Sequence, residues 1–140
     1  MTTTTTIQTL TLDGALAAIR ASREKANTLG VPVCLAVVDR AGVLLAFERL
    51  DGAPALSIKL AQDKAYTVTA FGLPTREWYP LIAQEPALLH GIVKADRLII
   101  FGGGAPVTVD GQIVGAVGAS GGSAEQDDLI ASAGAAAVSN

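Results

Sequence analysis

The segment FGGGAPVTVDGQIVGAVGASGGSAEQDD, residues 101–128, contains the clearest hairpin pattern in the chain and decides the fold. Two apolar runs, 105–109 and 112–119, flank the dipeptide Asp110-Gly111. An Asp-Gly pair between apolar runs is typical of a two-residue hairpin turn. The segment also holds eight of the chain's 15 glycines. It therefore predicts an antiparallel pair of strands, and its glycines raise the question of a ligand.

A helix is predicted directly after this hairpin. Ser123 is a favourable N-cap residue for this helix, and Gln126, three positions later, stands at the spacing of a capping box. We expect the inner face of this helix to carry Leu129, Ile130, Ala133 and Ala137.

The rest of the chain adds two helices and three strands. The segment 75–91 holds the only Trp and the only His, together with two prolines, and is expected to form short helical turns or a long ordered loop. Because the strands come in hairpins, we predict an α+β fold with a mainly antiparallel sheet and helices packed on it. The expected helices cover 11–30 and 54–71, and the expected strands cover 31–39, 43–50 and 96–101.

Length and composition limit the classes of function. We expect residues 1–10 to be a flexible lead-in and residues 11–140 to form a single domain. The chain is 50% hydrophobic and 16% charged, so excess apolar surface predicts a homo-oligomer. No apolar run approaches the roughly 20 residues of a membrane span, and no secretory signal is present, so we expect a cytoplasmic protein with no membrane partner. A net charge of -3 without a basic patch argues against nucleic acid.

The glycines at 102–104 and 121–122 have two interpretations. They permit tight turns and close packing, or their backbone amides face a ligand ahead of the helix at Ser123. The pattern is neither a phosphate-binding P-loop nor a dinucleotide fingerprint.

Several side chains are candidates for a pocket. Ser57 and Lys64 lie seven residues apart, within about 20° on a helix, and Phe71 falls on the same stripe. Lys64 either extends to water or faces a pocket. Arg49 stands on an apolar strand face, where a buried guanidinium requires an anionic partner. Glu125 can reach a site at the glycine loop, although the helix dipole also explains its position.

The remaining reactive residue types give weak signals. His90 is the only candidate for a proton shuttle or an imidazole ligand, and a lone loop histidine is more often structural. Ser120 in GASGG resembles a nucleophile elbow only superficially, and Cys34 is expected to be an inert core thiol. We predict no metal site.

Four stretches taken together resemble a known family. VVDRAG, DGAPALSIKLAQDKAYT, FGGGAPV and DGQIVGAVGASGGSAEQDD are similar to the motifs of the GlcG/HbpS family, which resembles the C-terminal domain of PduO-type proteins and includes haem-binding members. The resemblance extends from about Leu12 to Ala137. It implies a profilin-like fold with a five-stranded antiparallel sheet flanked by helices, and it implies oligomers. PduO-type relatives can place a histidine near Arg76, and if that histidine is a ligand, its absence in TREWY counts against haem here.

Two functions follow from these observations. The first is an oligomeric small-ligand-binding protein of the GlcG/HbpS type, with haem or a related tetrapyrrole as the candidate ligand and Thr or Tyr oxygens as alternative iron ligands. The second is a catabolic enzyme of hydrolase, deaminase or tautomerase type that acts on a short organic acid, with Lys64 and Glu125 as catalytic residues. An accessory subunit without chemistry is a third possibility. The candidate ligand-binding residues are Arg49, Ser57, Phe71, His90, Gly102, Gly103, Gly104, Ser120, Gly121 and Gly122.

Overall fold

The computed structural model describes all 140 residues and shows five α-helices, a short 3-10 helix and four strands. In chain order these are α1 (Leu12–Leu29), β1 (Cys34–Asp39), β2 (Leu44–Arg49), α2 (Leu56–Phe71), the 3-10 helix η1 (Thr75–Glu77), α3 (Trp78–Ile82), α4 (Pro86–Ile92), β3 (Gly104–Val109), β4 (Gln112–Ser120) and α5 (Ala124–Val138).

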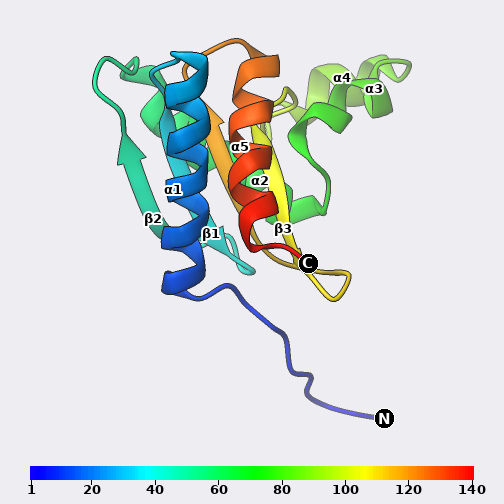
Figure 1. The fold of residues 1–140 in the computed structure, drawn as a ribbon. Coiled ribbons are helices and arrows are strands. Elements are labelled where there is room, and N and C mark those ends of the chain that lie inside the picture. The colour runs from blue at the N-terminus through cyan, green and yellow to red at the C-terminus, as the bar shows by residue number, and fades with distance from the viewer.

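The strands form one antiparallel sheet in the order β2-β1-β4-β3. Helices α1 and α5 lie side by side on one face, and α2 packs on the opposite face (Figure 1). The predicted α+β class, with an antiparallel sheet flanked by helices, is confirmed. Its profilin-like character stays a prediction.

The expectation of a fifth strand over 96–101 is wrong. Arg97 adopts a left-handed backbone, with φ of 65°, which interrupts any extended run. The Ile99 N–H donates to the Thr67 hydroxyl at 3.0 Å, and the same hydroxyl lies 2.9 Å from the Arg97 carbonyl. A side chain of α2 therefore satisfies the backbone groups that a neighbouring strand would otherwise bind.

Local signals placed the ends of the long helices correctly. The Thr11 hydroxyl accepts from the Gly14 N–H at 3.1 Å, and α1 ends at Gly30 with a left-handed φ of 69°. Ser123 and Gln126 form the predicted capping box at the start of α5. The expected inner face of α5 is wrong in detail, because its buried residues are Asp127, Ile130, Ala131, Gly134 and Ala135.

The two faces of the sheet have different cores. Fifteen buried apolar residues lie between the sheet and the α1–α5 layer. On the α2 face, the buried residues are mostly small, such as Ala36, Ala61, Ala65 and Ala116. Small side chains let α2 lie close against β4. The close approach brings the Lys64 side chain of α2 against β4.

The C-terminus is tied to the outer edge of β3. The Thr108 N–H donates to the Ser139 hydroxyl at 3.0 Å, and the Asn140 N–H donates to the Thr108 carbonyl at 3.0 Å. The Asp110 N–H donates to the Asn140 side chain at 2.8 Å. These bonds occupy backbone groups at an edge of the sheet that would otherwise be open.

Of the two forms expected for segment 75–91, short helical turns or a long ordered loop, the structure shows the first, as η1, α3 and α4. In Figure 1, α3 and α4 project beyond the sheet, and no residue of α4 is buried. Several of their apolar side chains face outward, including Leu81, which is 57% exposed, and Leu88. We call α3 and α4 together the arm. No helix in this chain is both long and apolar enough to span a membrane.

Candidate functional site

Lys64 lies inside the protein rather than on its surface. It faces the sheet from the middle of α2 and is only 1% exposed. Its ammonium donates to Oδ2 of Asp127 on α5 at 3.0 Å and to the carbonyl of Ala119 on β4 at 2.9 Å. Neither expected position, snorkelling to water or facing a pocket, describes it. Lys64 is one half of a buried ion pair that joins α2, β4 and α5.

Burial changes the protonation behaviour of Lys64. Loss of hydration lowers the pKa of Lys64 from its ordinary value of 10.5, and the Asp127 carboxylate partly opposes that shift. The ring centroid of Phe101 lies 5.1 Å from Nζ, within range of a cation–π contact. The other Asp127 oxygen accepts from the Gly122 N–H at 2.8 Å. The ammonium thus has two hydrogen-bond acceptors, and each oxygen of the Asp127 carboxylate accepts one hydrogen bond.

Sequence reasoning selected Glu125 and missed Asp127 as the partner of Lys64. The signal was available, because Asp127, Ile130, Ala131 and Gly134 share one helical face at spacings of three and four residues. Glu125 instead lies exposed on the surface.

The glycines of 102–104 lie close against α2, β4 and α5, and Gly103 makes room for the Lys64 ammonium. A Cβ on Gly103 would lie 2.6 Å from the Lys64 ammonium, and Gly103 itself has a left-handed φ of 127°. A Cβ on Gly102 would lie 2.8 Å from the Ala124 carbonyl, and one on Gly104 would lie 2.7 Å from the Lys64 carbonyl. At Gly121 and Gly122, atoms of Pro32 and Gln126 respectively occupy the space that a Cβ would need. The close approach of the protein's own atoms explains these glycines.

Two other predicted residues meet beneath α2. Ser57 and Ser120 are both buried, and their hydroxyls lie 3.3 Å apart. Arg49 is exposed, and its guanidinium donates to the Ala53 carbonyl at 2.8 and 3.1 Å instead of pairing with an acid. Cys34 is fully buried, and that burial raises the pKa of its thiol, opposed by the charge of Arg49. An inert core thiol is the expected behaviour for such a group.

A groove of about 720 Å³ and a second of about 530 Å³ are the larger hollows of the surface. The smaller of these, which we call the aromatic groove, adjoins the glycine loop. Its lining includes Gly102 and the half-exposed rings of Tyr79 (56%) and Phe101 (46%). The other lining side chains are Arg76, Pro80, Ile100, Ala124, Glu125 and Asp128.

The aromatic groove combines an apolar surface with a few charges. Arg76 lies 3.3 Å from the Asp128 carboxylate, and this pair is partly exposed. Phe101 both lines the groove and contacts Lys64. The groove suits a flat apolar ligand that carries a polar edge.

Phe71 and His90 do not line this groove. Phe71 contacts the buried Trp78 with the rings tilted by 47° and their centroids 4.7 Å apart, and His90 lies exposed on α4. The indole N–H of Trp78 has no hydrogen-bond partner. The structure thus gathers Ser57, Ser120, Lys64 and Gly102–Gly104 under α2, and it leaves Arg49, Phe71 and His90 elsewhere.

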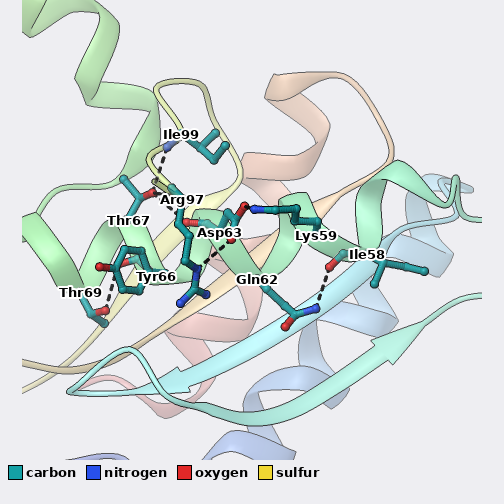
Figure 2. Close-up of polar contacts among 9 residues, drawn as sticks. All are labelled: Ile58, Lys59, Gln62, Asp63, Tyr66, Thr67, Thr69, Arg97 and Ile99. Carbon is teal, nitrogen blue, oxygen red and sulfur yellow. Dashed lines mark hydrogen bonds and ion pairs between the residues drawn. The ribbon is translucent and has the colours of Figure 1, made fainter. Parts of the chain in front are cut away.

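A second charged cluster lies along the outer side of α2, and the sequence analysis did not predict it. Asp63 is buried and binds both Lys59 and Arg97, the latter through Nε at 3.0 Å (Figure 2). Arg97 also lies over the Tyr66 ring, 4.1 Å from its centroid. Only the four-residue spacing of Lys59 and Asp63 was visible as a signal. Arg97 is more than 30 residues away in sequence, and no local pattern identifies it.

Known proteins match this chain along most of its length. A family model described as "Haem degrading protein HbpS-like" matches residues 10–136. A 15.0 kDa protein of Citrobacter freundii, encoded in the dhaT–dhaS intergenic region, is 40% identical over 127 residues, which is 89% of each chain.

Two solved structures are similar in both fold and sequence. The crystal structure of ORFY from Klebsiella pneumoniae is 36% identical with a TM-score of 0.92, and the match covers 99% of this chain and 96% of that one. A crystal structure of a PduOC–haem complex is 35% identical with a TM-score of 0.84, and the match covers 93% and 95% respectively.

Proposed function

The chain belongs to the HbpS-like family, and from this premise we propose that it is a ligand-binding protein that takes haem or a related tetrapyrrole. The similarity to the PduOC–haem complex supports this ligand class. The structural observation that carries the proposal is the aromatic groove, where the exposed Phe101 ring and the exposed Tyr79 phenol line one apolar hollow.

The residues of the aromatic groove fit such a ligand. Pro80, Ile100 and Phe101 supply an apolar surface for the faces of a tetrapyrrole. The Tyr79 phenol is a type of oxygen ligand that haem iron accepts in proteins. Arg76 can bind a carboxylate of the ligand edge through two parallel hydrogen bonds. Bound haem would supply a redox-active iron, and these residues would orient it and exclude water from one face.

The groove volume is consistent with this role. At about 530 Å³, it falls in the range of about 300–1,000 Å³ that is usual for small-ligand sites. Tyr79 stands three positions after Arg76, so an oxygen ligand is available in the segment where some relatives place a histidine.

We also propose that the protein is a homo-oligomer in which the arm contacts a neighbouring copy. The exposed Leu81 and Leu88 support this, because apolar side chains gathered on a projecting segment are usually covered by a partner.

The alternative of a catabolic enzyme gains no support from the geometry. Its catalytic base would be Lys64, whose ammonium is 1% exposed and already bound to Asp127 and Ala119. Glu125 lies in the aromatic groove, but on the surface side. In this structure the Lys64 ammonium is therefore not exposed to a substrate.

Haem titration of the purified protein, followed by absorbance, tests the proposal. We expect a saturable Soret shift with the native chain. The Tyr79→Phe variant should bind at least about tenfold more weakly or move the Soret band, because the iron loses its oxygen ligand. The matched control is His90→Ala, which removes a surface group outside the groove and should change neither affinity nor spectrum.

Two results would contradict the proposal. Absence of any saturable shift would remove haem as the ligand. Binding that is lost in His90→Ala but kept in Tyr79→Phe would place the ligand on α4 instead of in the aromatic groove.

A further inference from the structure

The larger hollow lies on the opposite side of α2 from Lys64, and it is independent of the function proposed above. This hairpin groove, as we call it, has a volume of about 720 Å³ and runs between residues 41–44 and α2. Val43, Leu44 and Ile58 give it an apolar wall, and all three side chains are exposed. Lys59, Tyr66 and Arg97 give it polar groups.

Arg97 is held in place from three directions. Its Nε donates to the buried Asp63 carboxylate at 3.0 Å, and its guanidinium lies on the Tyr66 ring at 4.1 Å. Its backbone is fixed in a left-handed conformation next to the Thr67 hydroxyl, which is fully buried. A guanidinium anchored in this way has lost most of its rotamer freedom before any ligand arrives.

The terminal nitrogens of Arg97 remain available. Only Nε has a hydrogen-bond partner, and the residue lines the hairpin groove. Figure 2 shows the free end of the guanidinium pointing between Tyr66 and Gln62, toward the β1–β2 hairpin. If Arg97 served only to fix the 96–101 segment to α2, its Nε hydrogen bond to Asp63 would be sufficient. The two remaining nitrogens face a hollow with an aliphatic wall.

We propose that the hairpin groove is a binding site for a small aliphatic monocarboxylate. Arg97 takes the carboxylate through its terminal nitrogens, since a planar guanidinium matches that group with two hydrogen bonds. Lys59, whose side chain is 69% exposed, adds a second positive charge. Val43, Leu44 and Ile58 receive the hydrocarbon tail.

The charges of the groove favour one carboxylate over two. Lys59 and Arg97 are positive, but Asp63 already neutralises part of that charge from beneath. Asp96 also lines the groove and is exposed, so it repels a second negative group on the ligand. A dicarboxylate of similar length should therefore bind more weakly than a monocarboxylate.

The test is a ¹H–¹⁵N NMR titration of the full chain with butyrate, butyramide and succinate. Butyrate should shift the amides of Val43, Leu44 and Ile58 saturably, with a Kd on the order of 1 mM. Butyramide has the same shape without charge and should bind about tenfold more weakly, as should succinate. Arg97→Lys keeps the charge but not the paired donors and should lose about tenfold in butyrate affinity.

Two further variants test the second positive charge of the groove and control for general charge effects. Lys59→Met changes an exposed side chain and should weaken butyrate binding several-fold while leaving the amide spectrum dispersed. Arg20→Lys alters an exposed arginine of α1 in the other helix layer and should leave the affinity unchanged.

The proposal is overturned if these amides do not shift, if butyramide binds as well as butyrate, or if Arg97→Lys binds as tightly as the native chain. It is also overturned if the groove amides respond to protein concentration instead of butyrate, because a second copy of the chain would then occupy the groove.

Discussion

At the scale of single residues, the Lys64–Asp127 pair is the most consequential interaction in the chain. The side chains of Lys64 and Asp127 are 1% and 4% exposed, so both charges have lost most of their hydration, and the hydrogen bonds between them and to neighbouring groups must offset that loss. Asp127 binds Lys64 with one oxygen and the Gly122 N–H with the other, so both of its oxygens are occupied. Removal of either partner leaves the other charge buried and unpaired.

Lys64→Met should therefore lower the free energy of unfolding by about 3–5 kcal/mol, as expected for breaking a buried pair. Denaturant unfolding of the native chain and the variant at neutral pH measures this loss. The matched control is Lys59→Met on the same helix, which removes an exposed ammonium and should cost about 1 kcal/mol or less. Equal effects of the two variants would contradict a special role for Lys64.

The pH dependence of stability provides a second measurement of this pair. Burial lowers the pKa of Lys64 in the folded protein below 10.5, while the unfolded chain keeps the ordinary value. Between these two pKa values the unfolded state binds more protons, so the contribution of Lys64 to stability rises with pH and levels off above 10.5. The stability difference between the native chain and Lys64→Met should thus increase in this window, and a decrease would reverse the assigned direction.

Trp78, unlike Lys64, is a buried side chain with a polar group that has no hydrogen-bond partner. Its indole N–H is unpaired, and its side chain is 3% exposed. An unsatisfied buried donor costs about 1–3 kcal/mol, which offsets part of the packing energy. Trp78→Phe should accordingly destabilise by about 1 kcal/mol or less, against about 3–5 kcal/mol for Trp78→Ala. Thermal and denaturant unfolding of both variants measure these values. Similar losses in the two variants would contradict the expected cost of an unsatisfied N–H.

At the scale of elements, the fold depends on how closely α2 approaches the sheet. Gly118 on β4 lies directly beneath α2, and a Cβ there would collide with the Ala61 carbonyl and lie 2.9 Å from the Ala65 nitrogen. Both of these are backbone atoms, which cannot rotate away. The position of α2 therefore depends on residues that have no side chain.

Gly118→Ala should destabilise the protein by about 1–3 kcal/mol or more, because the helix must shift outward to accommodate the methyl group. The control is Gly91→Ala in α4, where a Cβ meets nothing within 4 Å. That change should be neutral or stabilise by up to about 1 kcal/mol through helix propensity. Denaturant midpoints distinguish the two, and a tolerated Gly118→Ala would contradict the close approach.

The elements also show which parts of the structure the sequence could predict. The capping box of Ser123 and Gln126 and the stop at Gly30 depend on residues a few positions apart, so a local pattern identified them. The prediction of a fifth strand over 96–101 was wrong because Thr67, about thirty residues earlier, binds the backbone at Arg97 and Ile99. Likewise, Lys64 and Asp127 are 63 positions apart, and only the folded chain reveals that they pair.

At the scale of the whole molecule, the arm is the feature on which the proposed contact between copies rests. It lies beyond the sheet, has few contacts with the body, and exposes apolar side chains (Figure 1). Trp78 and Ile82 fix α3 to the body, and the exposed apolar side chains of the arm are the type of surface that marks an interaction site.

If copies assemble through the arm as proposed, the double variant Leu81→Asp, Leu88→Asp should shift the protein from an oligomer toward the monomer, because it places charge in the proposed contact. Sedimentation velocity measures the masses. Leu12→Asp, also at an exposed leucine but on α1, should leave the assembly unchanged. A native chain that sediments as a monomer, or an arm variant that assembles normally, would contradict the proposed contact.

The bonds that tie Ser139 and Asn140 to β3 have a consequence for joining this fold to other polypeptides. A fusion before Met1 would extend from exposed residues that lead away from the body (Figure 1). A fusion after Asn140 would begin at a residue whose N–H and side chain both bind the sheet, and displacing them would leave the β3 edge free to recruit another strand. The two ends are therefore not equivalent points of attachment, and a tag or second domain is best tolerated at the N-terminal one.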